Sequence, residues 1–287
     1  MYRVKYINDI DKIPQLSREE KRNLKEVTDR YKFRASDYYL SLIDWEDPND
    51  PLRKIVIPQP EELNEWGNLD ASSESRNYVT TGLQHKYRDT ALLLTTKVCG
   101  SFCRFCFRKR LFMADNAELG RDIESGVEYI AEHPEINNVL LSGGDPLLLS
   151  TDKLEWLIGK LREIPHLNII RIGSKMPIFN PYRIIDDSKL QNLISKNSSP
   201  RRRIYLITHV NHPRELAPPT VEALDIFHCA GAVLCSQSPV LRKVNDDSDI
   251  MAELMRQLSG MGVIPYYFFI NRPTRGNKPF RVPLSRA

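Results

Sequence analysis

Short apolar runs alternate with helical stretches along the chain from about residue 91 onward. Runs rich in β-branched and large apolar residues are separated by segments with a 3.6-residue period. The clearest helical segment is 151–163, which places four apolar residues on one face: Leu154, Leu157, Ile158 and Leu161. The predicted strands are 91–96, 138–142, 168–173, 203–208, 232–237 and 264–270.

This alternation predicts an α/β fold built from six βα units. A partial, TIM-like (β/α)6 barrel is expected, because functional-looking residues follow the carboxyl ends of the strands, where barrel sites gather. A doubly wound open sheet is the competing topology. Hydrophobic periodicity does not separate the two.

The start of the chain predicts helices. Ser17 and Glu20 form a capping-box pattern, and apolar residues follow at helical spacing. A second helical run is expected at 38–43. This part of the chain is therefore expected to be an N-terminal helical extension.

A connector should follow these helices. The stretch 44–51 is acidic and ends in prolines that cannot continue a helix, and 58–82 is polar and irregular. We therefore expect an N-terminal helical region with its connector over 1–82, and the main domain over 83–287.

Size and composition exclude several classes of protein. The chain has 287 residues, of which 41% are hydrophobic, enough for a large core. No apolar run approaches the roughly 20 residues of a membrane span, and the first residues lack the apolar core of a signal peptide. The net charge of +4 is small for this length and does not indicate nucleic-acid binding. We expect a cytoplasmic protein that binds neither membranes nor nucleic acid.

Three of the five cysteines lie within eight positions, at Cys99, Cys103 and Cys106, just after the first predicted strand. This C-x3-C-x2-C spacing suits metal ligation in a reducing compartment better than a disulfide framework. A [4Fe–4S] cluster normally takes four thiolates, so three would leave one iron open to another ligand. The alternatives are buried thiols without a metal or three quarters of a zinc site.

Basic residues surround the cysteines. They give the loop a positive charge that would attract carboxylates, although the same residues could form a solvated edge. These residues are Arg104, Arg108, Lys109 and Arg110.

Polar residues end several predicted strands. Ser142 to Asp145 follows the second strand, where paired glycines let a ligand approach the backbone, although Gly-Gly-Asp is also a common turn. His209 ends a later strand and could equally be a satisfied core histidine. The other strand-end candidates are Arg171, Gly173, Ser174, Gln237 and Ser238.

Longer stretches resemble a known family. The cysteine loop resembles the cluster motif of the radical S-adenosylmethionine (SAM) superfamily, and nearly the whole chain resembles its lysine 2,3-aminomutase family. Together the matching stretches are more specific than the cysteine spacing. They are 47–54 (DPNDPLRK), 82–87 (GLQHKY), 140–147 (LLSGGDPL), 160–166 (KLREIPH), 171–174 (RIGS), 208–213 (THVNHP) and 265–267 (PYY).

The resemblance implies a partial barrel of the radical SAM type and a set of cofactors. Cys99, Cys103 and Cys106 would hold a [4Fe–4S] cluster, whose fourth iron would bind SAM through its amino and carboxylate groups. One electron, from a donor such as flavodoxin or ferredoxin, would then cleave SAM to a 5′-deoxyadenosyl radical.

The resemblance also implies roles for single residues. Arg108, two places after the last cysteine, would pair with the substrate carboxylate, and His209 would lie at the floor of the active site. Cys229 and Cys235 are expected to be buried thiols, although some family members recruit a cysteine from this region to a zinc site. The residues that would contact SAM are Ser142, Gly143, Gly144, Asp145, Arg171, Ser174, Gln237 and Ser238.

The sequence departs from the family at the lysine that carries the cofactor pyridoxal phosphate. Characterised aminomutases carry pyridoxal phosphate (PLP) on a lysine in a glycine-rich segment beyond the sixth strand. No lysine here has a matching context, and Lys278 is expected at the surface. The chain is therefore expected to be either a truncated version of a longer enzyme or a natural short relative that uses the radical without PLP.

A second departure concerns the substrate. Lysine-specific members carry an aspartate after the sixth strand, and Arg272 falls at that position. An arginine repels the ammonium of lysine and favours an anion, so an acidic amino acid such as glutamate is expected. The alternative is that the loop is shifted and Arg272 faces solvent.

The expected function is that of a radical SAM isomerase, a 2,3-aminomutase that abstracts hydrogen from an amino acid and shifts the amino group where PLP is available. Two other interpretations stay open. One is a PLP-independent radical reaction, such as epimerisation or modification of a peptidyl residue. The other is a metal-binding interaction protein without turnover. Homo-oligomerisation also stays open.

Overall fold

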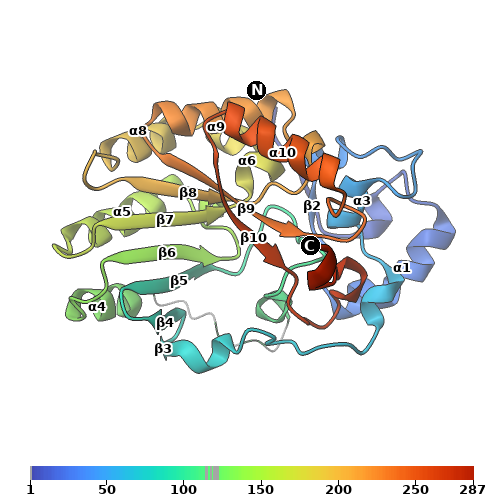
Figure 1. Cartoon of the computed structure of the whole chain (residues 1–287), viewed down its shortest axis with the longest axis horizontal. Helices are drawn as coiled ribbons and strands as arrows, with labels where there is room; N and C mark the ends of the chain where they lie inside the picture. The colour runs from blue at the N-terminus through green and yellow to red at the C-terminus, as the bar shows by residue number, and fades with distance from the viewer. Residues whose placement is uncertain (1, 114–115, 117, 119–122) are drawn as a thin grey trace.

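An eight-stranded sheet forms the centre of the fold (Figure 1). The computed structural model describes residues 2–113, 116, 118 and 123–287. The strand order in the sheet is β10-β9-β8-β7-β6-β5-β4-β3. The strands are β3 (Tyr78–Thr80), β4 (Leu83–Tyr87), β5 (Thr90–Thr96), β6 (Asn138–Gly143), β7 (Ile169–Ser174), β8 (Ile204–Thr208), β9 (Val233–Val240) and β10 (Ile264–Ile270).

The six predicted strands are confirmed as β5 to β10, and neighbours among them run parallel. Their order in space follows their order in the chain. A doubly wound sheet reverses this order at its switch point, whereas barrel strands keep it. The chain therefore adopts the predicted partial (β/α)6 barrel. In the part of the chain that the structure describes, β10 pairs with β9 alone, so the sheet is open.

Two short antiparallel strands extend the sheet beyond β5, and the sequence did not predict them. β4 pairs with β5, and β3 pairs with β4. The predicted boundary at residue 82 thus lies between two paired strands. The division into 1–82 and 83–287 stays a prediction.

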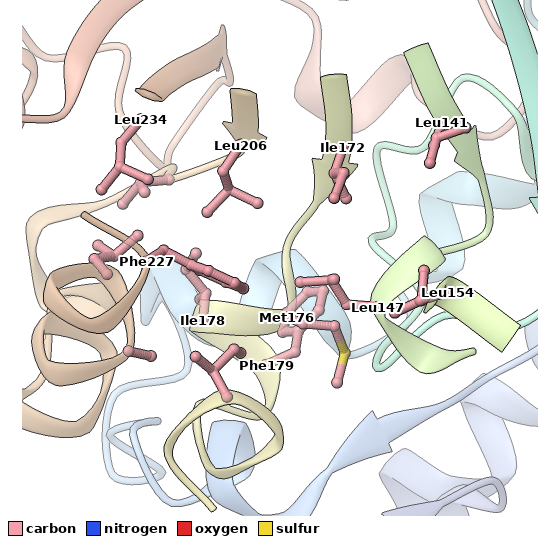
Figure 2. Packing of buried hydrophobic residues seen from close by; sticks show 14 of the residues in the cluster. Leu141, Leu147, Leu154, Ile172, Met176, Ile178, Phe179, Leu206, Phe227 and Leu234 are labelled. Carbon is pink, nitrogen blue, oxygen red and sulfur yellow. The ribbon is translucent and has the colours of Figure 1, made fainter. Parts of the chain in front are cut away.

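Helices pack on one face of the parallel strands and bury their apolar side chains against it. Figure 2 shows side chains from four neighbouring strands, among them Leu141 and Ile172, pointing toward Phe179 and Phe227. The predicted helix 151–163 is confirmed as α5. The helices are α4 (Glu124–Glu132), α5 (Thr151–Glu163), α6 (Met176–Phe179), α7 (Tyr182–Ile185), α8 (Ser188–Lys196), α9 (Pro218–Cys229) and α10 (Ser248–Gly260).

The N-terminal region begins with the predicted capping box. Ser17 Oγ accepts the Glu20 N–H (3.1 Å), and the Glu20 carboxylate accepts the Ser17 N–H (2.8 Å), so helix α1 starts where expected. The remaining elements are β1 (Tyr6–Ile7), α1 (Arg18–Arg30), β2 (Ala35–Ser36), α2 (Asp37–Leu40) and α3 (Pro51–Val56).

The connector predicted at 44–51 ends in a helix start. Pro51 is the first residue of α3, and the Asp50 side chain caps it by accepting the Arg53 N–H (2.8 Å). Proline fits this position because the first helical N–H needs no partner within the helix. The proline that was expected to exclude a helix therefore begins one.

Strand β10 is exposed along its whole length. Each residue of Ile264–Ile270 is exposed, including large apolar side chains such as Phe268 (55%). Among the described residues, no helix combines the length and the apolar character that crossing a membrane would require.

Candidate active site

Both ends of the chain fix the cysteine loop that follows β5. The Arg104 N–H donates to the Ile55 carbonyl oxygen (2.8 Å) in the N-terminal region. The Asn277 side-chain amide donates to the Phe105 carbonyl oxygen (2.6 Å). The loop is therefore held at the carboxyl end of β5 by segments far from it in the sequence.

The three thiols of the loop lie in a common, partly buried environment. Burial raises the pKa of Cys99, Cys103 and Cys106, to about 12 for Cys103. Charge on Cys106 raises the pKa of the other two further. Three thiolates are unfavourable here unless a cationic group lies between them, and an iron–sulfur cluster is such a group. The donor set therefore fits a cluster.

A single-ion site has less support. Nowhere in the described residues do three histidine, cysteine, aspartate or glutamate side chains form a group that could hold one metal ion. In a cluster each thiolate binds a different iron, so its ligands need not converge on one point. The zinc interpretation of the three cysteines has no such arrangement to support it.

All four bases around the cysteines pair with carboxylates of the protein itself, and three of them, Arg104, Lys109 and Arg110, are buried. The buried Arg104 and Lys109 both donate to Glu62, Arg104 through Nε (2.9 Å) and Nη2 (2.8 Å) and Lys109 through Nζ (2.8 Å). Burial raises the pKa of Glu62, but the two cations outweigh burial and hold it below its ordinary value. Arg110 is also buried and pairs with Glu74 (3.0 Å). These bases do attract carboxylates, but those of the protein itself, and the alternative of a solvated edge is wrong for Arg104, Lys109 and Arg110 because they are buried.

Arg108 differs from the other three bases because it also bonds to the end of β6. Its Nη1 donates to Ser142 Oγ (2.8 Å) at the carboxyl end of β6, and its Nε and Nη2 donate to the Glu74 carboxylate (2.9 and 2.7 Å). Burial raises the pKa of Cys106, and hydrogen bonding and charge from Arg108 partly oppose this. Arg108 is therefore a partly accessible cation (12% exposed) between the cysteine loop and β6.

Asp145 joins the carboxyl ends of β6 and β7. Its buried carboxylate accepts Ser174 Oγ–H (2.7 Å), the Lys175 N–H (2.8 Å) and the Leu147 N–H (3.1 Å). Burial raises the pKa of Asp145 to about 6, although these hydrogen bonds lower it. Two residues predicted to contact SAM, Asp145 and Ser174, thus bond to each other.

Gly143 and Gly144 allow two segments of the chain to approach closely. A Cβ atom on Gly144 would lie 2.2 Å from the Val98 carbonyl oxygen, and one on Gly143 would lie 2.7 Å from that of Thr96. The Gly144 N–H donates to the Thr96 carbonyl oxygen (2.6 Å). The approaching segment leads directly into Cys99. Packing within the chain therefore explains the paired glycines without a ligand.

Gly144→Ala is expected to lower both the melting temperature and the iron content after anaerobic reconstitution, because residues 96–98 must move away from the new Cβ atom. Gly159→Ala in α5 is the matched control. Its Cβ atom would meet nothing within 4 Å, and it should stabilise the helix by about 0.5–1 kcal/mol. Thermal unfolding and iron analysis of both variants check this. Unchanged stability and full iron content in Gly144→Ala would contradict the steric argument.

His209 directly follows β8, and Gln237 lies in the neighbouring strand β9, where its side chain interacts with the His209 ring. Burial lowers the pKa of His209 to about 4; the charges of Lys175 and Arg108 add to this, and the interaction with Gln237 opposes it. His209 is therefore neutral at ordinary pH. The structure places it near Gln237 and Arg108.

Lys175 belongs to this group, but sequence reasoning missed it. Its buried Nζ donates to Glu215 (2.7 Å) and to Asn211. Its charge lowers the pKa of Cys103 and of His209. A lysine directly after a predicted strand end was the available signal. Glu62 and Glu74 were missed as well, because their segment has no periodic pattern.

Three predicted residues make other contacts. Arg171 donates through Nη2 to Asn138, the first residue of β6, at the end of the strand away from the cysteine loop. Ser238 Oγ donates to the Val210 carbonyl oxygen (2.9 Å). Arg272 is exposed in the loop after β10. In the described part of the chain, neither arginine has a hydrogen bond or ion pair to another predicted site residue.

The two remaining cysteines differ in exposure. Cys235 is buried as expected, whereas Cys229 is exposed at the end of α9, so the prediction of a buried thiol is wrong for Cys229. Lys278 is exposed, as expected.

No protein-family model matches the chain. Individual proteins do match it. A Clostridium subterminale protein named L-lysine 2,3-aminomutase is 38% identical over 288 residues, which are 99% of this chain and 68% of the relative. The chain belongs to the lysine 2,3-aminomutase family. An Aquifex aeolicus member, named "Putative L-lysine 2,3-aminomutase", is 52% identical over 286 residues, 99% of this chain and 76% of the relative.

The relatives of this aminomutase-family chain are named for different substrates. A Clostridioides difficile protein named glutamate 2,3-aminomutase is 34% identical over 280 residues, 97% of this chain and 65% of the relative. Among solved structures, Escherichia coli coproporphyrinogen III oxidase, described as a radical SAM enzyme, is similar at a TM-score of 0.44 and 12% identity, over 77% of this chain and 54% of that one. That likeness is too low to carry an argument.

Family membership confirms the resemblance seen in the sequence. The relatives are named aminomutases, so the protein is an enzyme of the aminomutase type. SAM and an iron–sulfur cluster are what its resemblance to the radical SAM superfamily implies. The three thiols at the end of β5 fit such a cluster.

Proposed function

We propose that the protein is a cytoplasmic 2,3-aminomutase that holds a [4Fe–4S] cluster on Cys99, Cys103 and Cys106 and acts on a free amino acid. The observation that carries the proposal is the loop after β5, where three thiols with raised pKa values adjoin the partly accessible Arg108. When bound, the cluster and SAM would supply the radical that removes a hydrogen atom from the substrate. Flavodoxin or ferredoxin is the proposed electron donor.

The chain's own residues would bind and orient the substrate. Arg108 would bind its carboxylate through charge-assisted hydrogen bonds. His209 would offer a neutral hydrogen-bonding ring, because burial lowers its pKa to about 4. The residues proposed to contact SAM are Ser142, Gly143, Gly144, Asp145, Ser174, Gln237 and Ser238; among them, Asp145 and Ser174 also connect β6 to β7. Arg171 is left out, because its side chain bonds to Asn138 at the other end of β6.

Glutamate is the proposed substrate in preference to lysine. The support is Arg272, an exposed cation two residues after β10 that would favour an anionic distal group if the substrate reaches it. PLP would require a lysine for its attachment. The two buried lysines near the cysteine loop, Lys109 and Lys175, form ion pairs with Glu62 and Glu215, so neither is free to carry PLP.

Anaerobic reconstitution with iron and sulfide tests the proposal. Given SAM, a reductant, PLP and L-glutamate, a brown protein with [4Fe–4S] absorption should release 5′-deoxyadenosine and form the β-amino acid. Turnover of L-lysine but not of L-glutamate would show that glutamate is not the substrate. SAM cleavage without formation of a β-amino acid would favour PLP-independent chemistry. A colourless protein that contains zinc would reject the proposal that the protein is an enzyme.

A further inference from the structure

Glu74 is a buried carboxylate in contact with the arginine assigned above to the substrate. It lies at the start of a 3-10 turn (Glu74–Asn77), in the polar segment before the sheet, 34 positions before Arg108. Its side chain is 9% exposed and that of Arg108 is 12% exposed. This pair is therefore an internal feature of the site rather than a surface ion pair.

Glu74 holds one edge of the Arg108 guanidinium. The carboxylate accepts hydrogen bonds from Nε and Nη2, and Ser142 Oγ accepts one from Nη1. A guanidinium has five N–H groups, so these three bonds leave one N–H on Nη1 and one on Nη2. Two N–H groups are the number that a bidentate carboxylate needs. Glu74 and a ligand carboxylate can therefore bind Arg108 together.

Glu74 is itself fixed from two sides. Its N–H donates to the Asp70 carboxylate (2.9 Å), and Arg110 Nη2 donates to its second oxygen (3.0 Å). Arg110 is held in turn by Glu118 through Nε (2.9 Å) and Nη2 (2.9 Å). The first bond fixes the backbone of Glu74, and its carboxylate cannot turn away without breaking the bond to Arg110, so the orientation of Arg108 is set before a ligand arrives.

We propose that Glu74 is a positioning residue, which holds the guanidinium of Arg108 so that its free N–H groups face the α-carboxylate of the amino acid substrate. The inference rests on the proposed function, since it takes Arg108 as the carboxylate ligand. It adds that recognition depends on a carboxylate from the N-terminal region as well as on the arginine of the cysteine loop. Glu74 acts through Arg108 and does not touch the substrate.

Comparing the affinity for an amino acid with the affinity for its α-amide distinguishes a positioning role of Glu74 from a purely structural role. The full chain, reconstituted with cluster and SAM, is titrated calorimetrically with L-glutamate and with its α-amide, isoglutamine, which lacks the α-carboxylate. L-lysine and L-lysinamide form a second pair. The wild-type protein should prefer the acid by about tenfold or more, the range of charge-assisted hydrogen bonds. Glu74→Gln should remove most of this preference and leave amide affinity within about twofold.

Two further variants make the result specific. Glu65→Gln is the control, because Glu65 lies in the same polar segment and pairs with Arg30 and not with Arg108, and it should keep the wild-type preference. In an Arg108→Lys background, Glu74→Gln should have no further effect, since a residue that acts through Arg108 is silent without it. Melting temperatures of all variants show whether each remains folded.

Other outcomes would overturn the inference. Tighter acid binding in Glu74→Gln would make Glu74 a competitor of the substrate. An equal loss in Glu65→Gln would indicate a general structural effect, and additive losses with Arg108→Lys would mean that Glu74 acts independently. If Arg108→Lys alone keeps the acid preference, the assignment of Arg108 in the proposed function fails as well. If Arg108→Lys loses the preference and Glu74→Gln keeps it, only the inference fails.

Discussion

Cys103→Ala is expected to abolish reductive SAM cleavage, with a loss of roughly 1,000-fold or more, because the rate enhancement of the enzyme depends on its cofactor. With two thiolates left, the loop would hold the cluster weakly or not at all. The anaerobically reconstituted variant should lose the brown colour and most of its iron and sulfide. Its rate of 5′-deoxyadenosine formation should fall to the level of a sample without protein.

Cys229→Ala is the matched control, because Cys229 is an exposed cysteine at the end of α9, outside the loop. It should retain wild-type iron content and SAM cleavage. Full activity in Cys103→Ala would disprove the ligand assignment. An equal loss in Cys229→Ala would show that the assay reports general damage instead of cluster loss.

Glu62→Gln is expected to lower the free energy of unfolding by about 3–5 kcal/mol, the cost of leaving a buried charge without its partner. Glu62 is fully buried between Arg104 and Lys109, whose side chains are 2% and 6% exposed. Removing its charge would leave both cations uncompensated beside the cysteine loop. Urea unfolding of the apoprotein, monitored by circular dichroism, measures the difference.

Two comparisons make this prediction specific. Glu61→Gln changes the exposed neighbouring carboxylate and should cost less than about 0.5 kcal/mol. Lys109→Met leaves the Arg104–Glu62 pair balanced, so it should cost less than Glu62→Gln. If Glu62→Gln behaves like Glu61→Gln, the buried pairs contribute nothing to stability.

The same pairs predict a pH dependence of stability. Arg104 and Lys109 hold the pKa of Glu62 below its ordinary value despite burial. A depressed carboxyl pKa stabilises the folded state above the unfolded-state pKa, and this stabilisation is lost as the pH falls through the folded-state pKa. The gap in stability between wild type and Glu62→Gln should therefore narrow in acid below about pH 4, which unfolding at a series of pH values would show.

The strands of the barrel could be predicted because a buried parallel strand is a continuous apolar run. The runs at 91–96 and 203–208 match β5 and β8 to within one residue. β3 and β4 were missed because they are short and largely polar: Leu83–Tyr87 carries glutamine, histidine and lysine in its middle. Such a strand forms because β5 offers it a partner, and a sequence pattern does not report that partner.

The carboxylates of the site could not be predicted in the same way. Glu62 and Glu74 lie in a polar stretch without periodicity, and nothing in their neighbours distinguishes them from surface residues such as Glu61. They matter because the fold places them against Arg104, Lys109 and Arg108 from 34 to 47 positions away. Ion pairs between distant segments depend on tertiary contacts, and one sequence carries no signal for them.

The sequence by itself determined the βα alternation and the spacing of the three cysteines, since each depends on local pattern, and the family resemblance singled out Arg108. Only the tertiary structure decided between a barrel and a doubly wound sheet, because helical and strand periods are the same in both and only the order of pairing differs. It also decided which bases of the cysteine loop are available. Arg104, Lys109 and Arg110 are buried against carboxylates of the protein, whereas Arg108 is the one of the four that also bonds to β6 and keeps free N–H groups there. Which carboxylates neutralise a base depends on the segments that pack against it, and only the tertiary structure shows these.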